Sequence, residues 1–181
     1  MYVYHAVRED MLSEKIVPMR DLCKTSEELY KGKMSKFPNQ YKRENQKVGV
    51  LNCEKRDVIF MTPIPPNILE EELKRRVGIS FEGTSFYKID LNKLDRKKMC
   101  IYLNFDPDDE SEFFPVNDKT LKKFDKYMSY TQEAKEYWEN IMLNSTRLRS
   151  LLFAGTYLFL HEGEIDISDC EIVTIEKAQP V

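Results

Sequence analysis

Glycine is scarce in this sequence, with 6 among 181 residues, and histidine is scarcer, with only 2. Few glycines disfavour a phosphate site built from a glycine-rich loop, and neither a P-loop nor a GxGxxG fingerprint is present. A nucleophile elbow and an HExxH motif are absent as well. The sequence therefore gives little support to a hydrolase with a Ser/His/Asp triad.

The cysteines are few and far apart. Cys23, Cys53, Cys100 and Cys170 contain no CxxC pair, and neither histidine lies near any of them. A zinc site or a disulfide framework needs tighter clustering or a secreted context. We therefore expect reduced, mostly structural thiols in a cytoplasmic protein, and no metal site.

Long apolar runs are also missing. No stretch approaches the roughly 20 apolar residues that cross a bilayer, so we expect no membrane association. The segment MYVYHAVRED has neither the basic region nor the apolar region of a secretory signal. A formal net charge of −3 is too small to indicate a partner, and the oligomeric state stays open.

What is present is a globular composition, with 41% hydrophobic and 33% charged residues. A chain of 181 residues can bury a core of its own. No internal repeat or low-complexity linker divides it. We therefore expect one soluble domain over 1–181.

The first half of the chain mixes strands and helices. The pattern predicts a strand at 2–4, a helix at 8–16 that ends before Pro18, and a short helix that begins at the capping box of 25–28 and closes at Gly32. The polar stretch 33–52 is predicted to be loop. A buried strand at 57–62 then runs through a proline-rich turn into an amphipathic helix at 68–77, with Gly78 as its stop.

The second half begins with predicted strands at 86–91 and 100–105, followed by an acidic loop at 106–115. Helical patterns follow at 118–128 and 131–143. The chain closes with strand-like segments at 157–160 and 171–175 around a turn at 161–164. This order lacks a regular βαβ rhythm, so it predicts an α+β fold: a mixed or split antiparallel sheet with flanking helices, ending in a β-hairpin.

His5 stands where the first predicted strand ends. An imidazole there can project into a cleft and donate to a ribose hydroxyl or a phosphate. It can equally cap the following helix or pack at the edge of the sheet.

Two charged loops and one strand end offer further alternatives. The segment 30–47 is basic and interleaved with aromatic residues, which suits phosphates and bases but also suits a solvated loop. The acidic segment 106–112 lacks the spacing of an EF-hand and is predicted to be solvated. Thr62, at the end of a buried strand, either lines a pocket or builds the rigid turn that follows it.

Taken together, these segments resemble the ADP-ribosyltransferase-like group. The opening Val3-Tyr4-His5-Ala6, followed by a helix, resembles the group's first strand with its NAD-binding histidine. Arg43 in a loop before the strand 57–62 is similar to the DarT type of DNA ADP-ribosyltransferase. The segment 158–172 resembles the final hairpin, which carries the catalytic glutamate.

The resemblance implies NAD as the cofactor and a protein or nucleic acid as the acceptor. His5 and Arg43 would then hold NAD, Thr62 and Tyr87 would line the cleft, and Glu162 would be the catalytic carboxylate. One departure matters: Tyr157 appears at the position where the family's strand begins with its glutamate, and Glu162 falls late, in the turn.

Three hypotheses follow. The first is an NAD-dependent ADP-ribosyltransferase. The second is a catalytically inactive module that binds a nucleotide or nucleic acid on the same scaffold, with Tyr157 beside the ligand. The third is a protein-interaction domain that docks a partner through the helices of 118–152, which are rich in aromatic residues such as Tyr127, Tyr130 and Trp138.

Overall fold

A computed structural model of the chain describes residues 1–7, 14–35, 44–78, 80–103, 113–132, 135–136 and 156–176. The strands are β1 (Tyr2–Ala6), β2 (Lys15–Ile16), β3 (Lys47–Val48), β4 (Cys53–Glu54), β5 (Val58–Met61), β6 (Ser85–Asp90), β7 (Met99–Leu103), β8 (Phe113–Pro115), β9 (Tyr157–Glu162), β10 (Ile165–Asp166) and β11 (Glu171–Thr174). The α-helices are α1 (Met19–Thr25), α2 (Glu27–Met34), α4 (Pro66–Val77), α5 (Asp118–Leu121) and α6 (Phe124–Tyr127). The short 3₁₀-helices are η2 (Lys55–Asp57), η3 (Leu91–Lys93) and η4 (Arg96–Lys98).

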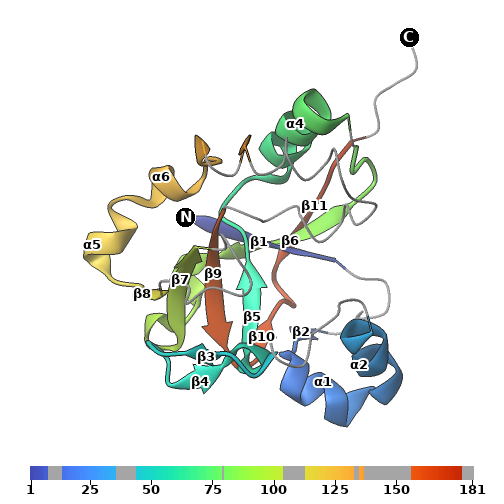
Figure 1. Ribbon diagram of the computed structural model, residues 1–181, viewed down its shortest axis with the longest axis vertical. Helices are drawn as coiled ribbons and strands as arrows, with labels where there is room; N and C mark the ends of the chain where they lie inside the picture. Colours follow the sequence, from blue (N-terminus) through green and yellow to red (C-terminus); the bar gives the residue numbers. More distant parts are fainter. Residues whose placement is uncertain are drawn as a thin grey trace.

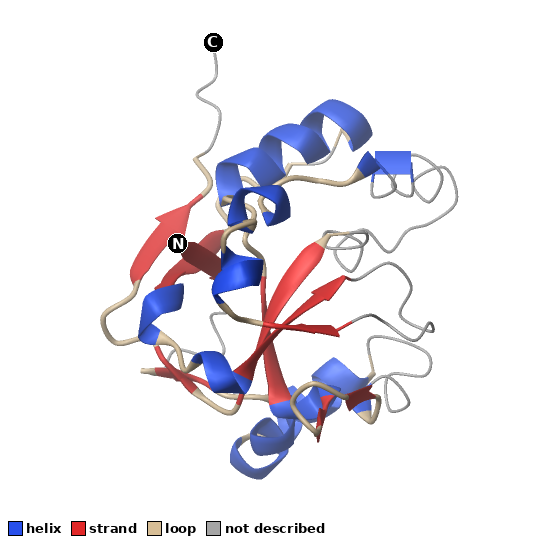
Figure 2. Cartoon of the chain, turned by 90° about the vertical axis from the view of Figure 1, so that its left-hand side faces the viewer, coloured by secondary structure: helices blue, strands red, loops and turns tan. Residues whose placement is uncertain are grey.

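Two antiparallel sheets form the centre of the fold. Sheet I has the strand order β1-β6-β11, and sheet II has the order β5-β9-β7-β8. Two smaller pairs, β2 with β10 and β3 with β4, are also antiparallel. Strand β1 crosses behind sheet II in Figure 1, while Figure 2 shows helices above and below the central strands.

The two sheets meet at a single antiparallel bridge between Tyr4 of β1 and Thr62, the residue after β5. Each residue donates its backbone N–H to the carbonyl oxygen of the other, at 2.7 and 2.9 Å. Beyond this bridge, no described residues pair β1 with β5 in a regular ladder. The sheet is therefore split, as the sequence predicts.

Side chains along each strand point alternately to the two faces of its sheet, and the core therefore forms separate layers. Odd-numbered residues of both sheets, including Val3, Tyr87, Ile59 and Phe159, share one buried cluster between the sheets. On the other side of sheet I, Phe86 belongs to a second cluster with Leu69 and Leu73 of α4 and with Ile64 in the turn before it. The even-numbered side of sheet II packs under the β3–β4 pair, through residues Val48, Cys53, Val58, Cys100, Tyr102, Leu158 and Leu160.

Local sequence explains the helix ends. Ser26 caps α2 by accepting from the Leu29 N–H. Pro66 begins α4, where its missing N–H costs no hydrogen bond, and Gly78 ends it in the left-handed conformation with φ of 66°. These ends agree with the predicted helices near 25–28 and 68–77.

The α+β class and the antiparallel sheets are confirmed, but several boundaries differ from the prediction. Residues 15–16 form β2 instead of a helical turn, because they pair with β10. Gly32 lies inside α2, which continues to Met34. The predicted loop 33–52 includes β3. The predicted helix at 118–128 is two short helices, α5 and α6.

The closing strands do not form the predicted hairpin. Strand β9 pairs with β5 and β7 in sheet II, whereas β11 pairs with β6 in sheet I and β10 pairs with β2. Ile165 and Ile167 enter the buried cluster between the sheets. The chain therefore leaves one sheet and joins the other instead of turning back on itself.

The predicted helix at 131–143 and the acidic loop at 106–112 fall mostly or wholly outside the described residues. Among the helices that are described, none combines the length and the apolarity needed to cross a membrane.

Candidate functional site

His5 lies at the place where the two sheets part. Its Nδ1 is 2.8 Å from the carbonyl oxygen of Phe60 in β5. A carbonyl oxygen can only accept, so Nδ1 carries the proton, and in the neutral ring Nε2 is the acceptor. The contact thus fixes both the orientation of the ring and its tautomer.

Tyr87 of β6 is the direct cross-strand neighbour of His5. Residues that face each other in an antiparallel pair point to the same side of the sheet. The Tyr87 side chain is buried in the cluster between the sheets, and its hydroxyl has no hydrogen-bond partner among the described residues. His5 and Tyr87, predicted together as cofactor-binding residues, are therefore adjacent on one face of sheet I.

The backbone of Thr62 lies at this junction, but its side chain stabilises the turn that follows β5. It is 2% exposed, and its Oγ1 accepts from the Ile64 N–H at 3.1 Å. By strand alternation it shares the side of Val58 and Phe60, away from the side of His5. Of the two interpretations of Thr62, the structure supports the rigid turn.

Glu162 ends β9 opposite Val58. It lies on the even-numbered side of sheet II and lines a pocket of about 460 Å³, together with Cys53 and Asp57. His5 is not among the residues that line this pocket. Within the described part of the chain, the Glu162 carboxylate makes no ion pair or hydrogen bond.

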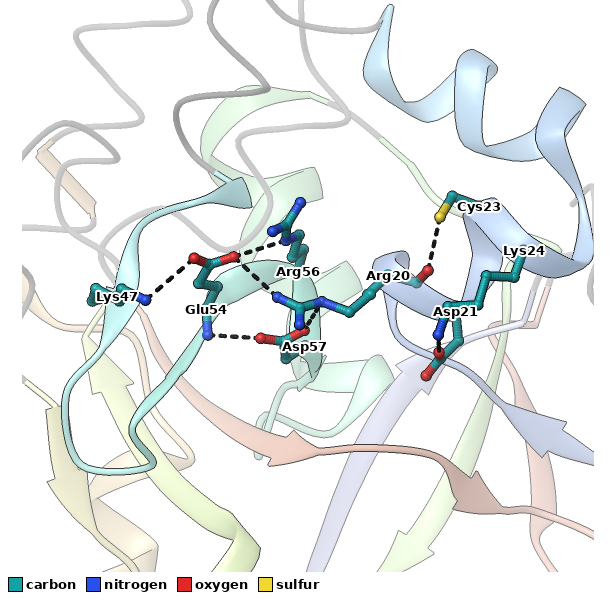
Figure 3. A network of polar contacts seen from close by, with 8 residues as sticks. All are labelled: Arg20, Asp21, Cys23, Lys24, Lys47, Glu54, Arg56 and Asp57. Atoms are coloured by element: carbon teal, nitrogen blue, oxygen red, sulfur yellow. Dashed lines mark hydrogen bonds and ion pairs between the residues drawn. The ribbon is translucent and has the colours of Figure 1, made fainter.

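The wall of the Glu162 pocket is a network of charged side chains (Figure 3). Arg20 of α1 pairs with both Glu54 and Asp57. Glu54 also accepts from Lys47 at 3.2 Å and from Arg56 at 2.8 Å. Asp57 accepts from the Glu54 N–H at 2.8 Å and so closes a capping box around η2. This network fixes α1 to the β3–β4 pair.

The pKa values of Glu54 and Cys53, which both line this pocket, shift in opposite directions. The hydrogen bond from Lys47 lowers the pKa of Glu54, although partial desolvation opposes it. Burial raises the pKa of the Cys53 thiol to about 11, and the carboxylates of Glu162 and Asp57 add to the rise. Cys53 is therefore a neutral thiol at physiological pH and unsuited to act as a nucleophile.

Tyr157 begins β9 at the end away from Glu162. Its ring lies 4.8 Å, centroid to centroid, from that of Tyr127 and packs against the cluster between the sheets. Tyr157 therefore shares the odd-numbered side of sheet II, which faces the side of sheet I that carries His5. Arg43 lies outside the described residues.

Comparison with known proteins gives one limited finding. No protein-family model and no curated protein matches the chain. Among solved structures, the chain is similar to one described as Thermosipho africanus DarTG in complex with ADP-ribose, with a TM-score of 0.46 and 9% identity. The likeness covers 96% of this chain and 43% of that one, so this chain spans less than half its length. Likeness at this level establishes neither a family nor an activity.

Sequence reasoning missed the network around Glu54 and Asp57. The spacing Glu-x-x-Asp just before a buried strand was a usable sign of a cap, but the pairing with Arg20 is a tertiary contact without a local sign. It also missed His161, which is 6% exposed and whose Nδ1 has no partner within the described residues. Burial lowers the pKa of His161 and so favours the neutral form of its ring.

The structure describes only part of two further segments with predicted roles, the basic segment 30–47 and the aromatic helices of 118–152. In the basic segment, Tyr30, Lys31 and Lys33 belong to α2, and 36–43 lies outside the described residues. In the aromatic segment, Tyr127 and Tyr130 are buried, which favours a core role over docking. Trp138 lies outside the described residues. The described residues contain no group of three His, Cys, Asp or Glu side chains placed to hold a metal ion.

Proposed function

We propose that this chain binds an ADP-ribosyl nucleotide, expected to be NAD, beside the junction of β1 and β5. We further propose that Glu162 does not catalyse cleavage of the bound nucleotide. The observation that carries the proposal is the convergence at this junction. His5 bonds to Phe60, which is 55 residues away in the chain, and its cross-strand neighbour is Tyr87. Both residues are those that the resemblance to ADP-ribosyltransferases assigns to the nucleotide.

The chemistry of the pair suits a ribose. The ring nitrogens of an imidazole and the hydroxyl of a phenol can each exchange hydrogen bonds with a ribose hydroxyl. Ligand sites in proteins combine a largely apolar lining with a few fixed polar groups. The cluster between the sheets supplies such a lining around Tyr87.

The position of Glu162 argues against catalysis at this site. A carboxylate that stabilises an oxocarbenium-like transition state must lie on the side where positive charge develops. Glu162 projects on the side of Cys53 and Asp57, whereas His5 and Tyr87 lie on the opposite side of the sheets. The residues of β9 on the His5 side are Tyr157, Phe159 and His161, and none of them has a carboxylate.

The test combines binding with a product assay. We expect NAD or ADP-ribose to raise the melting temperature of the purified chain and to bind by calorimetry, without release of nicotinamide on chromatography. His5→Ala should abolish the shift, and Glu162→Ala should leave it unchanged. Absence of binding by the wild-type chain would overturn the proposal.

The second candidate is an NAD-dependent ADP-ribosyltransferase acting on a protein or nucleic acid in the cytoplasm. The observation that favours it is the Glu162 carboxylate, half-buried in its pocket without a partner within the described part of the chain. Release of nicotinamide by the wild-type chain, lost in Glu162→Gln, would establish this candidate and refute binding without turnover.

A further inference from the structure

Strand β11 forms the outer edge of sheet I and carries Ile172 directly opposite Tyr87. Tyr87 in turn faces His5, so the three side chains form one row across β11, β6 and β1 on a single face. Ile172 is 55% exposed, more than any other large apolar side chain among the described residues. An apolar group thus stands uncovered at the end of a row that begins with His5.

Neighbouring rows confirm that side chains meet across these strands. Lys88 donates to Glu171 at 2.8 Å on the other face of the sheet. The hydroxyls of Ser85 and Thr174 lie 2.7 Å apart on the same face as Ile172. The Ile172 side chain is therefore flanked by Tyr87 across the strand and by this hydroxyl pair two residues further along.

We propose that Ile172 is a specificity-determining residue that packs against the flat ring of the bound nucleotide, adenine or nicotinamide, while His5 and Tyr87 contact the adjoining ribose. This inference rests on the proposed nucleotide site. Strands in a sheet lie about 4.8 Å apart, so Ile172 is roughly 10 Å from His5, a separation that one nucleoside can bridge. The ring would cover the exposed apolar surface and exclude water from it.

The row predicts which part of the ligand each residue senses. Truncation of Ile172 removes contact with the aromatic base alone, so a ligand without a base should bind the variant as tightly as the wild type. Ribose 5-phosphate is such a probe, whereas NAD and ADP-ribose carry an aromatic base. Ile68 of α4 is a matched control, because it is also an exposed isoleucine, with 36% of its surface accessible, on a different element.

The experiment is calorimetric titration of the wild-type, Ile172→Ala, Ile172→Leu, Ile68→Ala and His5→Ala chains with NAD and with ribose 5-phosphate. We expect Ile172→Ala to weaken NAD about five- to tenfold, as loss of one buried aliphatic contact implies, and to leave ribose 5-phosphate unchanged. Ile172→Leu should restore NAD affinity, and Ile68→Ala should match the wild type.

Three results would overturn the inference and leave the proposed function standing. In the first, Ile172→Ala binds NAD like the wild type while His5→Ala does not. In the second, Ile172→Ala weakens both ligands equally. A wild-type chain that binds neither ligand would instead overturn the proposed function, and the inference with it. A change in sedimentation of Ile172→Ala, with NAD binding intact, would assign the residue to self-association and also overturn the inference.

Discussion

The Nδ1 atom of His5 lies 2.8 Å from the carbonyl oxygen of Phe60, and this contact joins the two sheets beside the Tyr4–Thr62 bridge. It links β1 to β5 next to the single bridge that connects the two sheets. The histidine therefore has a structural partner, and the same partner sets the tautomer that it offers to a ligand. These two roles can be separated by substitution.

His5→Ala should destabilise the chain modestly and abolish nucleotide binding. The Phe60 carbonyl loses a part-buried hydrogen bond, worth about 1 kcal/mol in the free energy of unfolding. His5→Asn offers a control, because its amide N–H can replace the Nδ1 donor but cannot replace Nε2. Urea unfolding should show His5→Asn closer to the wild type, while calorimetry with NAD should show both variants impaired. Full NAD affinity in His5→Asn would remove the imidazole from the site.

Asp57→Ala should lower the free energy of unfolding by about 2 kcal/mol, because it leaves the Glu54 N–H without its cap and Arg20 without one of its partners. The Asp57 side chain is only 14% exposed, so solvent does not replace these contacts fully. Urea unfolding monitored by circular dichroism measures the change.

Asp21→Ala is the matched control for Asp57→Ala. Asp21 pairs with Lys24 on the surface of α1, where both side chains are well exposed. Exposed pairs contribute little, so the loss should stay below about 0.5 kcal/mol. Equal losses in the two variants would show that the network in Figure 3 does not fix α1.

The stability of the chain should decrease as the pH falls below about 6.5 because of His161. Burial lowers the pKa of His161 in the folded chain, so the unfolded chain binds this proton more readily. The contribution is complete above the unfolded pKa of 6.5 and is lost progressively as the pH falls toward the folded value. Urea unfolding at pH 7 and pH 5.5 should show the loss, and His161→Phe should reduce it.

A second core substitution separates this effect from general damage. Met99, the cross-strand neighbour of His161, is buried, and Met99→Leu conserves volume. This variant should keep the pH dependence of the wild type. If His161→Phe keeps it as well, the titrating group is another residue.

Cysteine labelling should distinguish the thiols sharply. Burial raises the pKa of Cys53 to about 11 and that of Cys100 to about 12, whereas Cys23 is exposed. At pH 8 the Cys53 thiol is therefore almost entirely protonated. Iodoacetamide followed by mass spectrometry should modify Cys23 first and reach Cys53 and Cys100 only after unfolding. Early labelling of Cys53 in the folded chain would contradict its burial.

The elements that sequence predicts well are those with strong local signs. The strand at β5, the proline turn and the stop of α4 at Gly78 each depend on residues within one segment.

Elements set by distant partners were harder to predict. β2 has two residues, and only its pairing with β10 makes it a strand. The closing segments alternate as a hairpin would, but β9 is drawn into sheet II and β11 into sheet I. The side on which Glu162 projects depends on register, and a shift of one residue would reverse it. Sequence alone could not fix that register.

Titration of the wild-type chain with NAD, followed by chromatography of the same mixture for nicotinamide, tests the central claim most directly. We expect saturable binding that His5→Ala abolishes, with NAD recovered intact after incubation. Failure of the wild-type chain to bind NAD, or release of nicotinamide that depends on Glu162, would contradict it.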